Sequence, residues 1–246
     1  MACYRRAEEG CQPELLHPPY ASSVDRAPRN PPILIPQTLS EITGPPFGGQ
    51  IVAGEIAAES GNYNQAQILD MTRSSGSLGE AIGQRIIVSG RLLDEDGRGV
   101  ASSLIEIWQA NAAGRYLHNM DQHDAPLDPN FTGVGQTMTD AEGKYRFATI
   151  LPGKYPWRNH FNAWRPAHIH FSLFGPAMTT RLVTQMYFPG DPLLAFDPIF
   201  NSTSNEAARA RLISSFDWES TIPESALGFH FDIVLRGRDE TPMENK

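Results

Sequence analysis

From residue 84 onward, the sequence is a series of short apolar segments separated by turn signals, and this pattern limits the fold more than any other feature. Several segments alternate polar and apolar residues with a period of two, as half-buried strands do. The expected strands are 84–93, 102–110, 167–175, 181–188 and 228–237, and residues 139–150 are expected to form a turn followed by a strand. With 20 prolines and 21 glycines to form turns, the pattern predicts a mainly β protein, a β-sandwich with mixed or antiparallel sheets.

Helical signals are confined to one late segment. Residues 204–216, SNEAARARLISSF, contain good helix formers, and Ser204 can cap the helix. We therefore expect one late helix beside the sandwich.

Residues 1–80 differ in composition from the expected β-sandwich domain, residues 81–246. The prolines of residues 17–36 exclude a regular helix or a central strand, and residues 37–49 allow only one short helical turn before a Gly-Pro pair. Disorder is the alternative to an ordered arm, but disordered segments are usually poor in apolar residues. We expect an N-terminal arm that wraps the core or a partner chain, with apolar surface from Ile33, Leu34, Ile35, Leu39 and Ile42.

Charge and cysteine content narrow the possible partners and compartment. The net charge of −8, without a basic run, argues against nucleic acid as a partner. Cys3 and Cys11 form no disulfide framework, which indicates a reducing, cytoplasmic compartment. The first residues lack the apolar region of a signal peptide. The sequence also contains no run of about 18 apolar residues, so we expect no membrane span.

The segment 164–171, WRPAHIHF, contains two histidines two residues apart within an expected strand. Side chains at this spacing share one face, so His168 and His170 project together while Ile169 points into the core. Two imidazoles on one face form half of a metal site. The alternatives are two hydrogen-bonded structural histidines, or a site for zinc, copper or ferrous iron.

Two tyrosines near this segment could complete a site. Tyr116 follows one expected strand, and Tyr155 lies in a turn before His168. A phenolate oxygen favours ferric iron, and although its pKa is ordinarily about 10, a trivalent cation can remove the proton. Spacing alone does not show that these side chains meet, and each tyrosine could equally be a packed aromatic residue. We expect His230 to be structural, and no metal role for His17, His118, His123 and His160.

Longer motifs add a family resemblance. Residues 90–116, 127–159 and 164–175 resemble the intradiol ring-cleaving dioxygenases, and the resemblance extends from about residue 15 to the C-terminus. The proline-rich arm and the segments YPWRN, QMYFPGDP and FDIVLRG most resemble the iron-bearing β chains of the protocatechuate branch. The resemblance implies cleavage of protocatechuate by dioxygen at a non-haem Fe(III) ion, giving 3-carboxy-cis,cis-muconate. It also implies the β-ketoadipate pathway of aromatic catabolism and an α/β hetero-oligomer.

The same resemblance assigns roles to individual residues. It implies that Tyr116, Tyr155, His168 and His170 hold the ferric ion together with a solvent hydroxide, and that Tyr155 leaves the metal when substrate binds. Trp108 is expected to pack in the core, the commoner fate of a tryptophan in a strand.

Five further residues match positions that contact substrate or act on it. Arg165 would stabilise negative charge on the ring, and Gln185 would hydrogen-bond near the substrate oxygens. Trp157 and Ile199 match pocket walls, and Tyr20 matches an arm tyrosine that reaches the substrate carboxylate.

Two other functions remain open from the sequence. One is intradiol cleavage of catechol or hydroxyquinol by a homo-oligomer. The other belongs to a different class, a non-catalytic β-sandwich binding module, which needs none of the tyrosine and histidine ligands.

Overall fold

The computed structural model describes residues 7–30, 32–33, 69–73, 79–174 and 181–244. Its strands are β1 (Arg85–Leu93), β2 (Leu104–Trp108), β3 (Val134–Met138), β4 (Lys144–Ile150), β5 (Tyr155–Pro156), β6 (Trp164–Arg165), β7 (His168–Phe174), β8 (Arg181–Tyr187), β9 (Ser215–Phe216), β10 (Leu227–His230) and β11 (Ile233–Val234). Its helices are α1 (Ala21–Arg26), the 3-10 helix η2 (Pro192–Ala195), α5 (Pro198–Asn201) and α6 (Glu206–Ala210).

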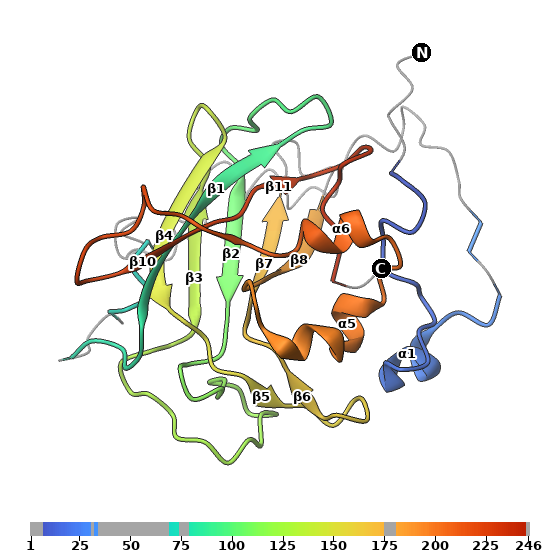
Figure 1. Cartoon of the computed structure of the whole chain (residues 1–246), viewed down its shortest axis with the longest axis horizontal. Helices are drawn as coiled ribbons and strands as arrows, with labels where there is room; N and C mark the ends of the chain where they lie inside the picture. Colours follow the sequence, from blue (N-terminus) through green and yellow to red (C-terminus); the bar gives the residue numbers. More distant parts are fainter. Residues whose placement is uncertain (1–6, 31, 34–68, 74–78, 175–180, 245–246) are drawn as a thin grey trace, which may run out of the picture.

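The strands form two main sheets and a short ribbon (Figure 1). One sheet has the order β3-β2-β7-β8, and all its pairs are antiparallel. In the other, β1 pairs in parallel with β10 and β11 and antiparallel with β4, while β9 extends the sheet beyond β10. The ribbon pairs β5 with β6. This arrangement confirms the predicted mainly β fold with mixed and antiparallel sheets.

Both sheets contribute side chains to one hydrophobic core. Ile86 and Phe147 come from one sheet, and Ile169 and Phe171 come from the other. The rings of Phe147 and Phe171 lie 6.0 Å apart across the core. Burial of such side chains stabilises a domain by about 1.5–3 kcal/mol each. The core side chains of β7 therefore fix this strand in place, with His168 and His170 on its opposite face.

In the sheet that contains β1, two stretches of backbone lie so close together that one of them requires a glycine. A Cβ atom at Gly90, in the middle of β1, would overlap the carbonyl oxygen of Phe231. The hydroxyl of Tyr145 on β4 donates a hydrogen bond to that same carbonyl. Gly90 therefore allows the chain between β10 and β11 to pass directly against β1.

The arm contains a helix that the sequence analysis excluded. α1 has six residues between the prolines at 18–19 and Pro28. The prediction was wrong because the stretch between these prolines is long enough for one to two helical turns. The helix ends before Pro28, since Ala27 is extended, as residues before proline usually are.

The late helical region also differs from the prediction. α6 is shorter than residues 204–216, and its cap is Asn205 rather than Ser204, since the Asn205 side chain accepts a hydrogen bond from the Ala208 N–H at 3.0 Å. Two further helices, η2 and α5, were not predicted; they begin with proline after Asp191 and Asp197 respectively. Both aspartates cap their helices, so the Asp-Pro pairs could have indicated them.

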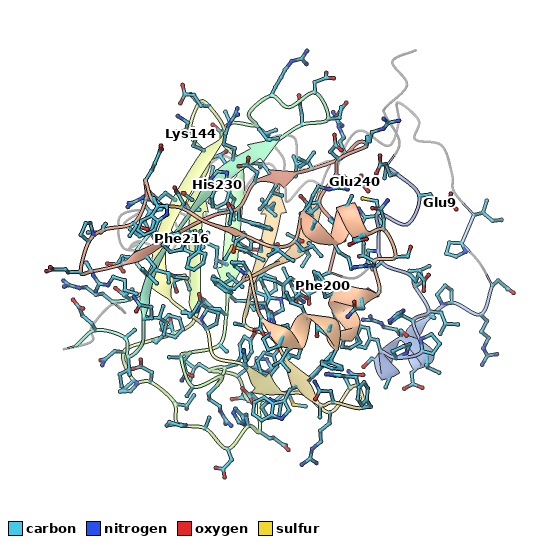
Figure 2. All side chains as sticks on the ribbon, in the orientation of Figure 1. Glu9, Lys144, Phe200, Phe216, His230 and Glu240 are labelled. Atoms are coloured by element: carbon cyan, nitrogen blue, oxygen red, sulfur yellow. The ribbon has the colours of Figure 1, made fainter. Side chains whose placement is uncertain are left out.

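The described part of the arm lies on the chain's own core. The Glu14 N–H donates to the Ser202 carbonyl at 2.9 Å, and the Ala21 N–H donates to the Asn159 carbonyl at 2.9 Å. Glu9 and Glu240, from opposite ends of the chain, lie toward the same side of the molecule (Figure 2). Residues 37–49 and the apolar residues from Leu34 to Ile42 are outside the described residues, and Ile33 is exposed. No helix in the described ranges is both long and apolar enough to cross a membrane.

Candidate metal centre and active site

His168 and His170 lie side by side on β7, as the strand period predicts. Ile169 between them is fully buried in the core. The two Nε2 atoms face each other at 3.2 Å, and the two rings meet edge to face at 4.8 Å. His168 and His170 are themselves 2% and 7% exposed, so the pair is enclosed by protein.

Strand register surrounds His170 with two side chains. Trp108 on β2 and Gln185 on β8 are its direct cross-strand neighbours. The Trp108 ring stacks on the His170 ring at 4.7 Å and 7°. The expectation that Trp108 packs in the core was wrong: it lies on the sheet face that carries the histidines, and it restrains the rotation of His170.

Hydrogen bonds at Nδ1 orient both imidazoles. The Nδ1 atom of His168 lies 2.7 Å from the Pro166 carbonyl oxygen, and that of His170 lies 2.8 Å from a carboxylate oxygen of Glu244. Because both partners are acceptors, each Nδ1 carries a proton, and in the neutral imidazoles each Nε2 presents a lone pair. Two such lone pairs facing each other at 3.2 Å repel unless a proton or another cation lies between them.

The two predicted tyrosines join the histidines in a closed cluster of rings. The Tyr116 ring meets the Tyr155 ring at 5.3 Å and the His170 ring at 6.3 Å. The Tyr155 ring meets the His168 ring at 5.5 Å, and the Tyr155 hydroxyl lies 3.4 Å from His168 Nε2. The structure thus brings together all four side chains predicted as metal ligands.

Local backbone features place each tyrosine. Gly114 has a φ of +80°, and a side chain there would overlap the Lys154 carbonyl, so this glycine lets Tyr116 approach Tyr155. The Asp121 carboxylate accepts a hydrogen bond from the Tyr116 N–H at 2.7 Å. Tyr155 is positioned by the β5–β6 ribbon, in which it lies directly opposite Arg165.

Arg165 is fully enclosed beside the ring cluster. Its Nη1 atom lies 3.1 Å from His168 Nε2 and donates to the Tyr155 hydroxyl at 3.5 Å. Its Nη2 atom donates to Gln185 Oε1 at 2.7 Å and to the Tyr187 hydroxyl at 3.1 Å. The Asp197 carboxylate accepts two bonds from Arg165, each at 2.9 Å. This geometry fixes a positive charge at the edge of the site.

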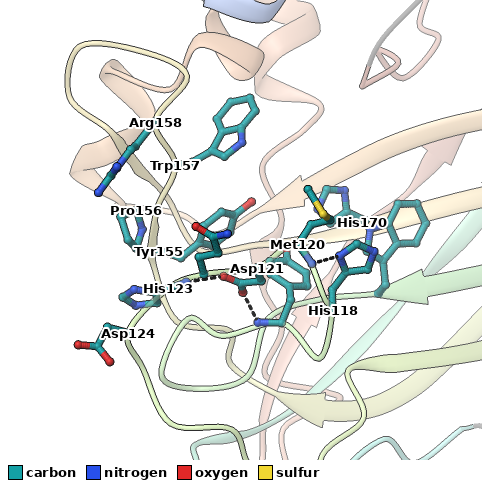
Figure 3. Close-up of a pocket in the computed structure, with 13 residues that line it drawn as sticks. His118, Met120, Asp121, His123, Asp124, Tyr155, Pro156, Trp157, Arg158 and His170 are labelled. Carbon is teal, nitrogen blue, oxygen red and sulfur yellow. Dashed lines mark hydrogen bonds between the residues drawn. The ribbon is translucent and has the colours of Figure 1, made fainter.

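The ring cluster borders an open pocket of about 770 Å³ (Figure 3). One part is lined by Trp108, Tyr116, His170 and residues 155–158, and the rest is lined by side chains of a loop at residues 118–124. The lining includes His118 and His123, which lie on this loop. Within this loop, the Asp121 carboxylate accepts a hydrogen bond from the His123 N–H at 2.8 Å, on the side of the pocket where Tyr155 lies (Figure 3).

Of the remaining predicted residues, Trp157 lines the pocket, whereas Tyr20, Arg165, Gln185 and Ile199 are not among its lining residues. Arg165 stacks over the Trp157 ring at 5.4 Å. Tyr20 is 6% exposed, and its ring lies 5.3 Å from that of Trp157, so the arm reaches the pocket wall. Ile199 is buried on α5, two residues after Asp197. His168, Arg165 and Gln185 lie behind the pocket lining.

Burial and charge set the protonation of the site. Burial, then the charges of Arg165 and His170, hold the pKa of His168 well below its usual value, so His168 is neutral at physiological pH. Burial also raises the pKa of Tyr116 well above its usual value. Without a cation, Tyr116 is therefore a neutral phenol.

The pair of Arg165 and Asp197 stays ionised despite its burial. Burial alone would raise the pKa of Asp197, but the Arg165 charge and hydrogen bonds outweigh it and lower that pKa. Burial likewise opposes the charge of Arg165, but Asp197 and the nearby phenols hold the pKa of Arg165 well above its usual value.

The residues fit a ferric ion. The hydroxyl of Tyr116 is buried and makes no hydrogen bond of good geometry; its interaction with Tyr155 adds to burial in raising the pKa of Tyr116. A poorly satisfied buried hydroxyl costs about 1–3 kcal/mol, and a bound cation would relieve that cost. Among the described residues, no cluster of three or more His, Cys, Asp or Glu side chains could hold a metal. Two imidazoles and two phenols remain, and anionic phenolate oxygens suit a hard trivalent cation.

Several important neighbours were absent from the sequence analysis. Glu244 lies 74 residues from His170 along the chain, and Asp197 lies 32 residues from Arg165. Tyr187 could have been found, because it shares a strand face with Gln185 two residues away. His230 is half exposed and lies 3.0 Å from Asp232. It belongs to β10, which pairs with β1 in the main sheet that does not carry His168 and His170.

Comparison with known proteins identifies the family. The family model described as Dioxygenase matches residues 58–237, and that described as Protocatechuate 3,4-dioxygenase beta subunit N terminal matches residues 4–38. The chain is 57% identical over 232 residues to the protocatechuate 3,4-dioxygenase beta chain of Burkholderia cepacia, covering 94% of this chain and 93% of that one. The alpha chain from the same organism is 27% identical over 206 residues, covering 85% and 96%.

A solved structure supports the fold. The hydroxyquinol 1,2-dioxygenase of Pseudomonas putida DLL-E4 matches with a TM-score of 0.50 and 24% identity, covering 68% of this chain and 58% of that one. The β-sandwich therefore has the fold of this dioxygenase. The chain belongs to the intradiol ring-cleavage dioxygenase family, as the motifs indicated.

Proposed function

We propose that this chain is the iron-bearing β subunit of an enzyme that cleaves protocatechuate with dioxygen between its two hydroxylated carbons, giving 3-carboxy-cis,cis-muconate. The observation that carries the proposal is the closed cluster of Tyr116, Tyr155, His168 and His170, whose two Nε2 atoms face each other at 3.2 Å. A binding module needs no such cluster. The reaction would serve the breakdown of aromatic compounds through the β-ketoadipate pathway.

The four clustered side chains would hold one non-haem Fe(III) ion. Bound there, ferric iron would bind both oxygens of a catechol and draw electron density from its ring, which makes reaction with dioxygen accessible. The residues of the chain supply the remaining functions: binding, orientation, proton transfer and charge stabilisation.

Each neighbouring residue has a distinct task in this proposal. A catechol loses two protons when both its oxygens bind; the Tyr155 phenolate oxygen would accept one of them, and a solvent hydroxide at the site would accept the other. Arg165 stabilises negative charge on the ring, because it is held at the edge of the cluster and stays protonated. Gln185 holds the Arg165 guanidinium through Oε1 and orients it.

The substrate carboxylate is assigned to the arm side of the pocket. Tyr20 and Trp157 pack together there, and the Arg26 guanidinium lies over the Tyr20 ring at 4.6 Å. A cation beside a phenol favours an anionic substituent, which protocatechuate has and catechol lacks. Ile199 would form part of the apolar wall.

The proposal includes the assembly and the organisation of the chain. The likeness to both a beta and an alpha chain supports an α/β hetero-oligomer. Residues 1–80 would be an arm on the catalytic sandwich of residues 81–246, and the contacts of Glu14 and Ala21 with the core support this. We also propose a cytoplasmic location, from the paucity of cysteines.

The test begins with colour. The chain, co-expressed with an α-type partner, is purified in air, and its visible spectrum is recorded before and after protocatechuate is added without oxygen. Charge transfer from tyrosinate to ferric iron should make the protein reddish, and the substrate should move the band to longer wavelength. Tyr155→Phe and His168→Ala should lose iron or ring cleavage, whereas the matched controls Tyr145→Phe and His230→Ala should keep both.

The substrate assignment has its own measurement. We expect kcat/KM for protocatechuate to exceed that for catechol and hydroxyquinol, and Tyr20→Phe to narrow this difference. A higher value for catechol or hydroxyquinol would replace the proposed substrate and leave the metal site intact. A preparation that stays colourless after ferric reconstitution would show that the tyrosines are not ligands.

A further inference from the structure

Glu244, near the C-terminal end of the chain, reaches a histidine of the proposed metal site. Its carboxylate oxygen lies 2.8 Å from His170 Nδ1, although the two residues are 74 positions apart. The Glu244 side chain is 15% exposed and that of His170 is 9% exposed. An acidic side chain so enclosed needs a partner, and His170 provides it.

The contact determines which nitrogen of His170 is free. A carboxylate only accepts hydrogen bonds, so it requires a proton on His170 Nδ1, and in the neutral imidazole the lone pair is then on Nε2. Histidines that bind metals are commonly oriented in this way by a carboxylate or a carbonyl. The other predicted ligand, His168, uses the carbonyl of Pro166 at 2.7 Å, a group from its own turn.

The two histidines therefore differ in what supports them. The partner of His168 is two residues away and follows from the local backbone. The partner of His170 depends on where the C-terminal segment lies. The Trp108 ring stacks on the face of the His170 ring and fixes its plane. The hydrogen bond to Glu244 then fixes the direction in which Nδ1 and Nε2 point within that plane.

The segment Thr241–Glu244 is held in place by hydrogen bonds on both sides. The Glu244 N–H donates to the Val183 carbonyl at 2.7 Å, and the Thr184 hydroxyl donates to the Pro242 carbonyl at 2.7 Å. These bonds fasten the segment to β8, the strand next to the histidines. The Thr241 N–H donates to the Val234 carbonyl at 2.9 Å, which fastens its start to β11.

The N-terminal arm holds the same segment from the other side. The Met243 N–H donates to Gln12 Oε1 at 2.8 Å, and Gln12 Nε2 donates to the Glu240 carboxylate. Figure 2 shows Glu240 on the side of the molecule where the arm residue Glu9 lies. A continuous series of contacts thus leads from the arm through the C-terminal segment to His170.

We propose that Glu244 is a positioning residue, which the C-terminal segment delivers to orient His170 and to strengthen binding of a ferric ion. The inference rests on the proposed function. Its physical basis is twofold: the carboxylate holds Nε2 toward the site, and its negative charge makes the imidazole a better donor to a cation. Loss of such a partner typically weakens metal binding about 10–100-fold.

The experiment measures iron binding rather than turnover. The complete complex with its α-type partner is prepared as wild type, Glu244→Gln and Glu244→Ala, and a chelator competes for iron while the tyrosinate–ferric band is followed. Gln keeps the size of the side chain and one acceptor but loses the charge, whereas Ala removes both. The matched control is Glu240→Gln, which removes a carboxylate from the same part of the chain, keeps an acceptor for Gln12 Nε2 and has no contact with a histidine.

We expect Glu244→Gln to weaken iron binding about 10-fold and Glu244→Ala up to about 100-fold. The band should move to longer wavelength in both, because a poorer histidine donor leaves the ferric ion a stronger electron acceptor. Glu240→Gln should match the wild type in affinity and band position. Thermal unfolding of the iron-free forms separates this effect from loss of folding.

The outcomes distinguish this inference from the proposed function. A coloured wild type with Glu244→Gln and Glu244→Ala of equal iron affinity and equal band position would overturn the role of Glu244 alone. Lower stability with an unmoved band would also overturn it, because it would reduce Glu244 to an anchor for the segment. A wild type that binds no ferric iron would refute the proposed function and this inference with it.

Discussion

Asp197→Asn tests how the structure keeps Arg165 charged and oriented. Arg165 is 2% exposed and Asp197 is 0% exposed. The carboxylate accepts two bonds from Arg165, one from the Tyr187 hydroxyl at 3.0 Å and one from the Phe200 N–H at 3.1 Å. Asparagine preserves the shape and caps α5 equally well, so the substitution isolates the loss of charge and of one acceptor.

The expected cost follows from the burial of the pair. Removing one partner of a buried ion pair leaves an uncompensated charge and costs about 3–5 kcal/mol. The new amide would also point N–H groups at a guanidinium that can only donate. For a chain of this size, about 2–4 °C per kcal/mol gives a fall in Tm of about 6–20 °C.

Asp191→Asn is the matched control. Asp191 caps η2 as Asp197 caps α5, accepting from the Leu193 N–H at 3.0 Å. Its ionic partner, Lys154, lies 3.2 Å away but is 44% exposed, and pairs with solvated partners contribute about 0–1 kcal/mol. Calorimetric unfolding should therefore separate the two variants widely. If Asp197→Asn unfolds within about 1 kcal/mol of Asp191→Asn, the reasoning about Arg165 is wrong.

Three further predictions follow from the same contacts. The folded pKa of Asp197 lies below its unfolded value of about 3.9, so the stability gap between wild type and Asp197→Asn should be constant from pH 7 to pH 5. This difference in unfolding free energy, measured by urea unfolding, should shrink below about pH 4. A difference that grows in acid would show that folding does not lower the pKa of Asp197. Gly90→Ala should cost about 3 kcal/mol or more, because the added methyl overlaps the Phe231 carbonyl; a loss under about 1 kcal/mol would show that β1 moves freely. Tyr116→Phe should weaken and shift the ferric colour, because it removes one of the two proposed tyrosinate donors. It should leave the iron-free chain as stable or up to about 1–3 kcal/mol more stable, because the buried Tyr116 hydroxyl makes no hydrogen bond of good geometry; clear destabilisation of the iron-free chain would contradict this.

The strand-based part of the site could be predicted from sequence because one rule determines it. Alternation along a strand places His168 and His170 on one face and Ile169 in the core, and the structure agrees. The same rule would have placed Trp108 beside His170 had the register of β2 and β7 been known. Register depends on distant turns and on the whole core, so local pattern did not supply it.

The loop-based part required information that spacing does not contain. Tyr116 and Tyr155 meet because Gly114 adopts a positive φ and because a two-residue ribbon places Tyr155 opposite Arg165. The motifs of the family suggested both tyrosines, whereas their separation in sequence did not. Helix α1 shows the opposite error, in which prolines were given too much weight over the short stretch between them.

Charge in the buried part of the site favours a cation. The Arg165 and Asp197 charges cancel in a closely hydrogen-bonded pair, and the lowered pKa of His168 makes that histidine neutral. The negative charge of the Glu244 carboxylate is therefore not neutralised by the Arg165–Asp197 pair. This carboxylate contacts Nδ1 of His170, on the side of the ring away from Nε2. A cation between the two Nε2 atoms would be attracted by this carboxylate and would convert Tyr116 from a strained neutral phenol into a stable phenolate. Each phenolate formed adds one negative charge beside the cation, and for this reason the arrangement favours a trivalent ion over a divalent one.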